Sequence, residues 1–208
     1  RPGHRTGLPV MIVAGLTGSI AMGKSETAKM FAERGIPVFD SDAAVHRLYA
    51  PGGGAVEAIR VLAPQAVADN GVDRQVLARL VQEDDTLLKR IEAVVHPLVK
   101  AAQMEFLAAA GQLADIAVLD IPLLFETKRD KEVDVVIVVS ASPELQRARA
   151  LARPGMTPEK LDFILSRQVP DAEKRARADY VIDTSVSLAQ TAREVEQVIA
   201  RIRATRGD

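Results

Sequence analysis

A glycine-rich stretch near the start of the chain, GLTGSIAMGKSE at residues 15–26, constrains the fold more than any other feature. Glycine loses the most conformational freedom on folding and gives the core no side chain, so its repeated use indicates a loop whose backbone meets a ligand closely. The apolar run Val10–Leu16 before it is typical of a strand buried on both faces of a parallel sheet. A helical pattern over Lys24–Arg34 follows and stops at Gly35, where we expect a left-handed cap.

The residues from Gly18 to Ser25 match the pattern GxxxxGK[ST] between a strand and a helix, which is the context that a phosphate-binding loop requires. Successive backbone N–H groups of such a loop curl around phosphate oxygens, and the helix start adds positive potential. Side chains at Gly18 and Gly23 would obstruct that curl. We expect Lys24 to reach the outer phosphates and Ser25 to offer its hydroxyl to Mg²⁺. A chance match has a probability on the order of one per cent, so we predict a nucleotide site here.

Strand and helix patterns alternate along most of the remaining chain. Further strands are expected at Ile36–Phe39, Ile116–Asp120, Val135–Val139 and Tyr180–Ile182. Helices are expected at Pro143–Ala152, at Pro158–Gln168 and after Ser187, which forms a capping-box pattern with Gln190. The region Val56–Ala110 has helical spacing almost throughout. The pattern predicts an α/β fold with a three-layer parallel sheet of about five strands flanked by helices, and with ligands beyond the carboxyl ends of the strands.

An acidic cluster, Asp40-Ser41-Asp42, ends the second expected strand. An acceptor hydroxyl that attacks a terminal phosphoryl group needs a carboxylate to orient it or to take its proton, and Asp42 suits that role. The alternative is that Asp40 or Ser41 caps the next helix. We expect one of these three residues to cap and one aspartate to do chemistry.

Arginines are concentrated after the fourth expected strand, at Arg147, Arg149 and Arg153, with Arg167 beyond them. Arginine stabilises charge on a transferring phosphoryl group, and helices over residues 143–168 would form a lid above it. Arg149 and Arg153 are four residues apart and share a helix face, whereas Arg147 points elsewhere. The alternative is that these arginines are solvated surface charges, as most single arginines in proteins are.

Composition excludes several other classes of protein. A formal charge of −1 and 3% aromatic residues argue against a nucleic-acid platform or an anionic membrane surface as the partner. The absence of cysteine excludes disulfides and thiolate zinc sites and fits a reducing compartment. No apolar stretch approaches the roughly 18 residues that span a bilayer. We therefore expect a cytoplasmic protein, in which residues 1–10 are a leader or a disordered terminus.

Six segments, in this order, resemble the dephospho-CoA kinase family: AGLTGSIAMGKS, VFDSDAAVHRLY, HPLV at 96–99, DIPLLFE at 120–126, SPELQRARALAR at 142–153, and SRQ followed by ADYVID. The resemblance runs from about Met11 to the final helix. It implies ATP-dependent phosphorylation of the 3′-hydroxyl of the dephospho-CoA ribose, with Mg²⁺, as the last step of coenzyme A synthesis. It also implies a P-loop, nucleotide-kinase-like core with a helical CoA-binding subdomain and a lid. We expect a monomer or weak homo-oligomer.

The resemblance implies one kinase domain over residues 11–208. Its parts are a core at 11–42, 116–142 and 171–208, a helical CoA-binding subdomain at 43–115, and a lid at 143–170. The implied catalytic residues are Lys24, Asp42 and Arg149. The implied ATP contacts are Gly18, Ser19, Ile20, Ala21, Met22, Gly23, Lys24, Ser25, Glu26, Arg149 and Arg153, with Ser25 as the metal ligand. The implied substrate contacts are Asp40, Asp42, His96, Pro122, Leu123 and Leu124, although His96-Pro97 fits a helix start almost as well.

The sequence departs from the family pattern in three places. Glu26 stands where threonine is common, Met22 occupies a loop position that is usually small, and Thr184-Ser185 replaces an asparagine near the adenine. The changes at Glu26 and Met22 leave the backbone N–H groups of the phosphate loop free to bind phosphate. The change at Thr184-Ser185 affects the expected contact with the adenine base. Asp120 resembles an acid that orients the metal, a residue that the family does not always keep.

Three rival functions remain. Thr127-Lys128-Arg129-Asp130 fits the TKxD guanine-reading pattern of a switch GTPase, but it precedes a strand instead of following one, and no DxxG lies between it and the loop. Another small-molecule or nucleoside-monophosphate kinase is the second rival, and the helical region at 43–115 favours a larger acceptor. The third rival is a protein without enzymatic activity, in which the loop binds a nucleotide to control assembly. In that case the aspartate and arginine clusters would be coincidental.

Overall fold

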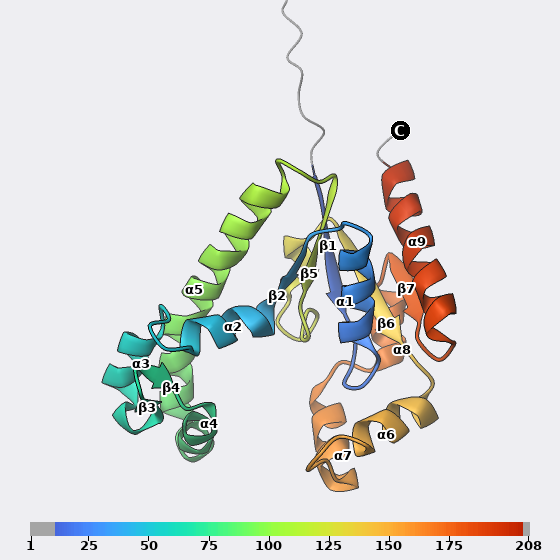
Figure 1. Cartoon of the computed structure of the whole chain (residues 1–208). Helices are drawn as coiled ribbons and strands as arrows, with labels where there is room; N and C mark the ends of the chain where they lie inside the picture. The colour runs from blue at the N-terminus through green and yellow to red at the C-terminus, as the bar shows by residue number, and fades with distance from the viewer. Residues whose placement is uncertain (1–10, 206–208) are drawn as a thin grey trace, which may run out of the picture. The chain divides into compact units, whose positions relative to one another are not determined.

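The computed structural model describes residues 11–205 (Figure 1). Its main sheet has five strands in the order β2-β5-β1-β6-β7. These strands are β1 (Ile12–Thr17), β2 (Val38–Asp40), β5 (Ile116–Asp120), β6 (Val135–Ser140) and β7 (Tyr180–Asp183). The expected leader or disordered terminus at residues 1–10 lies outside the described residues.

The central strand β1 pairs in parallel with β5 on one side and with β6 on the other, so that Leu16 lies opposite both Asp120 and Ile137. Strand β6 also pairs in parallel with β7. Every residue of β5 is buried, which is typical of a strand covered on both faces. The expected α/β fold, a parallel sheet of five strands flanked by helices, is confirmed.

Helices α1 and α9 cover one face of this sheet (Figure 1). Their apolar residues, such as Phe31 of α1 and Ile202 of α9, form one buried cluster with Leu16 of β1 and Ile137 of β6. Full burial of each such side chain contributes about 1.5–3 kcal/mol. The helices that follow the sheet strands are α1 (Lys24–Glu33), η2 (Arg129–Glu132), α6 (Pro143–Leu151), α7 (Pro158–Arg167), α8 (Asp171–Ala176) and α9 (Leu188–Ala204).

Helix boundaries agree with the expected start and stop signals to within one or two residues. The Ser142 and Thr157 side chains accept the N–H groups of Leu145 and Lys160 and so cap α6 and α7. Ser187 and Gln190 form the expected capping box of α9. Gly35, just beyond α1, has φ +75°, which is the left-handed conformation that a helix C-terminus favours.

The region between β2 and β5 has its own elements and its own core. Its buried cluster includes Ile59, Leu77 and Ile91. The elements are α2 (Ser41–Tyr49), α3 (Val56–Leu62), η1 (Pro64–Ala66), β3 (Val67–Ala68), β4 (Gly71–Val72), α4 (Arg74–Glu83) and α5 (Asp85–Ala110). The antiparallel β3–β4 hairpin interrupts the expected run of helices. Its turn residues, Asp69 and Asn70, both have positive φ, which these two residue types tolerate in tight hairpins.

The chain divides into two compact units. Among the described residues, the core unit comprises residues 11–38 and 110–205, and the helical unit comprises Phe39–Ala109. Helices α6 and α7, the expected lid, belong to the core unit. Within residues 11–205, no helix combines the length and the apolar character that crossing a bilayer requires.

Candidate active site

The phosphate loop, Gly18–Ser25, connects the end of β1 to the first turn of α1. A Cβ at Gly18 would lie 2.8 Å from the Val139 carbonyl oxygen of β6, so only glycine fits against that strand. Gly23 has φ +89°, and a Cβ there would lie 3.1 Å from the Thr184 hydroxyl. The two glycines are therefore needed for close packing and for a left-handed turn, in addition to the expected curl around phosphate.

Helix α1 begins without a side-chain cap, because its N-cap residue is Gly23. Among the described residues, the N–H groups of Gly23, Lys24 and Ser25 find no hydrogen-bond acceptor. Unsatisfied N–H groups at a helix start, together with the helix dipole, are the donors that bind phosphate oxygens. The Ser25 and Glu26 side chains are exposed at the same turn.

Lys24 forms an ion pair with Asp120 at the end of the neighbouring strand β5. The two side chains are mostly buried, with 16% and 6% of their surfaces exposed. The β1–β5 pairing places Asp120 opposite Leu16, near the start of the loop. Asp120, whose role the sequence left open, therefore holds the ammonium group of the loop lysine.

A pocket of about 310 Å³ lies beside the loop. It is lined by residues of the loop, α1, α6, α9 and the segment after β7, among them Ala21, Gly23, Glu26, Arg149, Arg153 and Thr184. The Arg149 guanidinium donates to the Thr184 hydroxyl (3.1 Å) and to the Thr184 carbonyl oxygen (2.7 Å). Both arginines that the resemblance assigned to ATP thus line one pocket with the loop.

The other two arginines of the cluster have different surroundings. Arg147 forms an exposed ion pair with Asp162 of α7 at 3.0 Å, as expected for a residue on another face. The Arg167 guanidinium lies 4.7 Å from the centre of the Phe163 ring. Neither residue lines the pocket beside the loop.

The acidic cluster belongs mainly to α2. Asp40 accepts the Ala43 N–H at 2.9 Å and caps this helix, so the expectation that one of the three residues is a cap is confirmed. Asp42 lies in the first turn with its side chain exposed. Both aspartates fall in the helical unit, and their roles toward ATP and the acceptor stay predictions.

The remaining expected substrate contacts differ in exposure. Leu123 is 41% exposed, whereas Leu124 is fully buried under Gly15 of β1. The Pro122 carbonyl oxygen accepts the Thr17 hydroxyl at 3.2 Å. His96 is exposed in the middle of α5. Because α5 continues through Pro97, the alternative that His96-Pro97 starts a helix is wrong.

The helical unit contains a second pocket of about 340 Å³. Its lining includes His46 and Tyr49 of α2, Pro51, Val72 of the hairpin and Arg74 of α4. Burial raises the pKa of the Tyr49 hydroxyl, and the nearby Arg74 charge lowers it in part. The hydroxyl therefore stays protonated at neutral pH and can donate a hydrogen bond.

Comparison with known proteins decides the family. A family model described as dephospho-CoA kinase matches residues 11–190. The chain belongs to the dephospho-CoA kinase family. A dephospho-CoA kinase from Mesorhizobium japonicum is 55% identical over 200 residues, which are 95% of this chain and 100% of that protein. One from Rhodopseudomonas palustris strain HaA2 is 52% identical over 190 residues, which are 91% and 94% of the two chains.

Solved structures share this fold. The crystal structure of TT1252 from Thermus thermophilus matches with a TM-score of 0.80 and 36% identity, and covers 92% of this chain and 98% of that one. A dephospho-CoA kinase from Campylobacter jejuni has a TM-score of 0.67 at 22% identity, with 92% and 97% coverage. At this level of identity, the similarity to the Campylobacter jejuni protein shows a shared fold.

Two of the departures from the family pattern contact each other. The Thr184 hydroxyl donates to the Met22 carbonyl oxygen at 2.6 Å, and the Met22 sulfur accepts the Ala141 N–H at 3.0 Å. Met22 is 2% exposed, so its side chain fills the space between the loop and the start of α6 without entering the phosphate cradle. These contacts attach the loop to β6 and to the segment after β7.

The guanine-reading alternative is not supported by the structure around Asp130. This aspartate is engaged by Arg177 at 3.1 Å, and the Thr127 hydroxyl donates to the Leu123 carbonyl oxygen. Lys128 has φ +56° and leads into η2. The TKRD segment therefore has a structural role as a turn between β5 and β6.

Sequence reasoning missed three polar residues at the phosphate loop: Gln146, Gln168 and, as a pocket-lining residue, Thr184. Gln146 and Gln168 contact Ile20, and both lie inside segments quoted for the family resemblance. Nothing in their spacing indicated a contact, because each is more than 120 residues from Ile20 in the chain.

Proposed function

We propose that this chain transfers the γ-phosphoryl group of ATP to the 3′-hydroxyl of the dephospho-CoA ribose, giving coenzyme A and ADP in the last step of coenzyme A synthesis. The observation that carries the proposal is the uncapped start of α1, whose free N–H groups adjoin Lys24, in a chain that belongs to the dephospho-CoA kinase family. In the reaction, a bond forms between the acceptor oxygen and the γ-phosphorus, and the bond from that phosphorus to the β,γ-bridging oxygen breaks.

In this proposal the phosphate loop binds the ATP phosphates through its backbone N–H groups. Lys24 neutralises charge on the outer phosphates, and its ion pair with Asp120 keeps the ammonium group beside the loop. Ser25 would offer its exposed hydroxyl to Mg²⁺. That ion usually keeps several waters and takes few protein ligands, so one hydroxyl is a sufficient protein donor. Mg²⁺ would neutralise charge on the phosphates when bound.

On the acceptor side, Asp42 would orient the 3′-hydroxyl and accept its proton. Its exposure at the first turn of α2 is compatible with contact to a substrate, whereas the neighbouring Asp40 is engaged as the helix cap. Asp40 would contribute through the position of the α2 start, in addition to its predicted place near the substrate.

Arg149 of α6 and Arg153, just beyond the end of α6, would contact the ATP phosphates. Arg149 is held by two hydrogen bonds to Thr184, which fix its guanidinium at the pocket, whereas Arg153 is exposed at the end of the helix. A planar, always charged guanidinium suits the charge that builds on a transferring phosphoryl group. Helices α6 and α7 correspond to the predicted lid.

The CoA part of the acceptor would bind to the predicted subdomain at 43–115. Its pocket combines apolar walls with a tyrosine hydroxyl and Arg74, groups that suit an amide-rich chain with a phosphate end. Exposed Leu123 and His96 are the more accessible of the other predicted contacts. A cytoplasmic location and a monomer or weak homo-oligomer stay predictions.

The direct test is to incubate the protein with ATP, Mg²⁺ and dephospho-CoA and to identify coenzyme A and ADP by mass spectrometry. Parallel reactions with shikimate and with nucleoside monophosphates as acceptors, and with GTP as donor, test the rival kinases. Coenzyme A formation that requires ATP is expected. Turnover of another acceptor without coenzyme A formation would overturn the proposal, and absent turnover with every acceptor would favour the non-enzymatic rival.

A further inference from the structure

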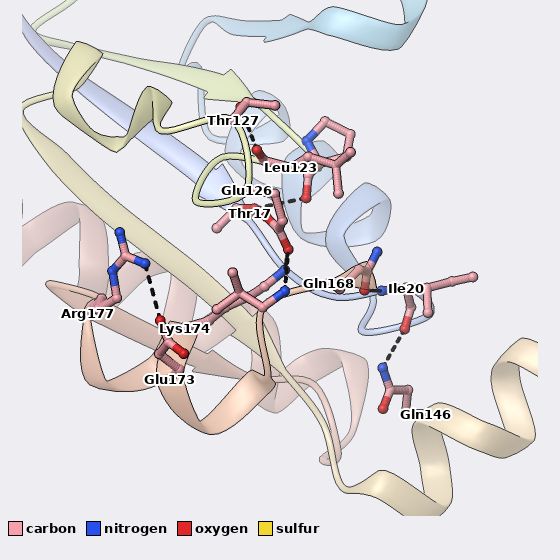
Figure 2. Close-up of polar contacts among 12 residues, drawn as sticks. Thr17, Ile20, Leu123, Glu126, Thr127, Gln146, Gln168, Glu173, Lys174 and Arg177 are labelled. Carbon is pink, nitrogen blue, oxygen red and sulfur yellow. Dashed lines mark hydrogen bonds and ion pairs between the residues drawn. The ribbon is translucent and has the colours of Figure 1, made fainter. Parts of the chain in front are cut away.

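Two glutamines from the predicted lid hold the backbone of Ile20 in the phosphate loop (Figure 2). The Gln168 side-chain oxygen accepts the Ile20 N–H at 3.1 Å, and the Gln146 side-chain NH₂ donates to the Ile20 carbonyl oxygen at 2.9 Å. Gln146 lies on α6, and Gln168 follows α7. The peptide groups on both sides of Ile20 are therefore bonded to residues far away in the chain.

An apolar cluster accompanies these hydrogen bonds. Ala21 of the loop is buried together with Ala150 of α6 and Leu161 of α7, and Ile20 packs against the same group. Helices α6 and α7 thus rest directly on the loop through both apolar and polar contacts. The predicted lid is attached to the phosphate loop at its base.

The position of Gln168 is set by a buried ion pair (Figure 2). The next residue, Val169, donates its N–H to Glu126 at 2.9 Å, and the same carboxylate oxygen lies 2.9 Å from the Lys174 ammonium group. Lys174 is fully buried, and the Glu126 side chain is 13% exposed. Burial raises the pKa of Glu126, but the Lys174 contact and the backbone N–H groups outweigh it and leave that pKa lowered. The carboxylate is therefore ionised at neutral pH.

The bond to the Ile20 carbonyl matters because Ala21 follows it with φ +61°. A non-glycine residue in this conformation is strained, and it persists only where its surroundings over-determine it. We propose that Gln146 and Gln168 are positioning residues that hold the strained phosphate loop in its binding shape, with Glu126 and Lys174 fixing the segment that carries Gln168. This inference rests on the proposed function in that the loop binds the phosphates of ATP.

The experiment compares Gln146→Glu with Gln168→Glu. Both substitutions keep the shape of the side chain and add one negative charge beside Ile20. Glutamate at 168 still accepts the Ile20 N–H, whereas glutamate at 146 has no proton to donate to the Ile20 carbonyl oxygen. Both variants add the same charge, so the difference between them reports the lost hydrogen bond together with the repulsion between the carboxylate at position 146 and the Ile20 carbonyl oxygen.

The readout is the affinity for ADP and for adenosine, measured by isothermal titration calorimetry, together with kcat/KM for ATP. We expect Gln146→Glu to bind ADP about tenfold more weakly than Gln168→Glu, with equal adenosine affinity, because only ADP carries phosphates. A matching tenfold difference is expected in kcat/KM for ATP. Equal ADP affinities of the two variants would overturn the proposal, as would an equal loss of ADP and adenosine binding in Gln146→Glu.

Neutral variants keep the test decisive if a charged variant does not fold. Gln146→Met and Gln168→Met each remove one bond to Ile20 at nearly constant volume, and each should weaken ADP binding several-fold relative to adenosine. Unchanged ADP binding in both would overturn the proposal. Failure of the proposed function shows itself separately, as a wild-type protein that binds ADP but forms no coenzyme A.

Discussion

The phosphate loop and the α6–α8 segment obtain their geometry in different ways. The loop is recognisable from consecutive residues, because Gly18, Gly23 and Lys24 form the turn that leads into the start of α1, and bonds from Gln146 and Gln168 add to the hold on its backbone. The α6–α8 segment is held by partners distant in sequence, as when Lys174 pairs with Glu126. A short motif is therefore enough to predict the phosphate loop. Contacts between residues distant in sequence cannot be predicted from a motif, because they form only when the chain is folded.

The largest effect is expected at the local site. Lys24→Ala removes the positive charge that faces the outer phosphates and should lower kcat/KM for ATP by about 10³-fold. Steady-state kinetics with dephospho-CoA measure this effect, and circular dichroism verifies that the variant is folded. A variant with near-normal kcat/KM would show that Lys24 serves mainly as the partner of Asp120.

The long-range site should respond in stability. Glu126→Gln leaves the buried Lys174 ammonium without an anionic partner, which should cost about 3 kcal/mol in the free energy of unfolding. Urea unfolding followed by circular dichroism at pH 7 measures this loss. The double variant Glu126→Gln with Lys174→Met is the control, because it removes the stranded charge and should recover much of the loss.

The same pair predicts a pH dependence. Because the pKa of Glu126 is lowered in the folded protein, its stabilising contribution is complete above its ordinary pKa of 4.5 and disappears as the pH falls through the lowered value. The stability difference between wild type and Glu126→Gln should therefore shrink in urea titrations between pH 5 and pH 3. A difference that stays constant over this range would mean that the carboxylate charge does not stabilise the fold.

Two neighbouring aspartates extend the comparison to the acceptor side. Asp42→Asn should lower kcat by about 10²-fold with little change in ATP affinity, because the amide cannot accept the proton of the acceptor hydroxyl. Asp40→Asn is the matched control, since asparagine also caps helices well, and it should leave the melting temperature nearly unchanged. A near-normal kcat for Asp42→Asn would show that Asp42 is not the base.

The smallest effect on catalysis is expected at Arg149, which lies on α6 and lines the pocket beside the phosphate loop. Arg149→Ala should lower kcat by about tenfold and weaken ATP binding less, because the charge that it stabilises is greatest in the transition state. Arg147→Ala, on the same helix with an exposed partner, should change neither. Equal effects of the two substitutions would show that Arg149 is an ordinary surface charge with no role in phosphoryl transfer.

Much of the fold was predictable from local signals. The strand Ile116–Asp120, the helix starts at Pro143, Thr157 and Ser187, and the cap at Gly35 were all predicted because apolar spacing and capping act over a few residues. The β3–β4 hairpin was missed, since each strand has only two residues and shows no periodicity. In the site, Lys24 was predicted from its motif, but its partner Asp120 was not, because strand register brings them together.

The sequence by itself determined the phosphate loop, the α/β class and, through six ordered segments, the family. Only the tertiary structure decided that Gln146 and Gln168 hold Ile20, that Thr184 attaches Met22 to Arg149, and that Asp40 caps its helix in preference to Ser41. The physical reason is the range of the interactions. Dihedral preferences and caps depend on neighbours in the chain, whereas hydrogen bonds between side chains and distant backbone depend on packing that no short pattern records.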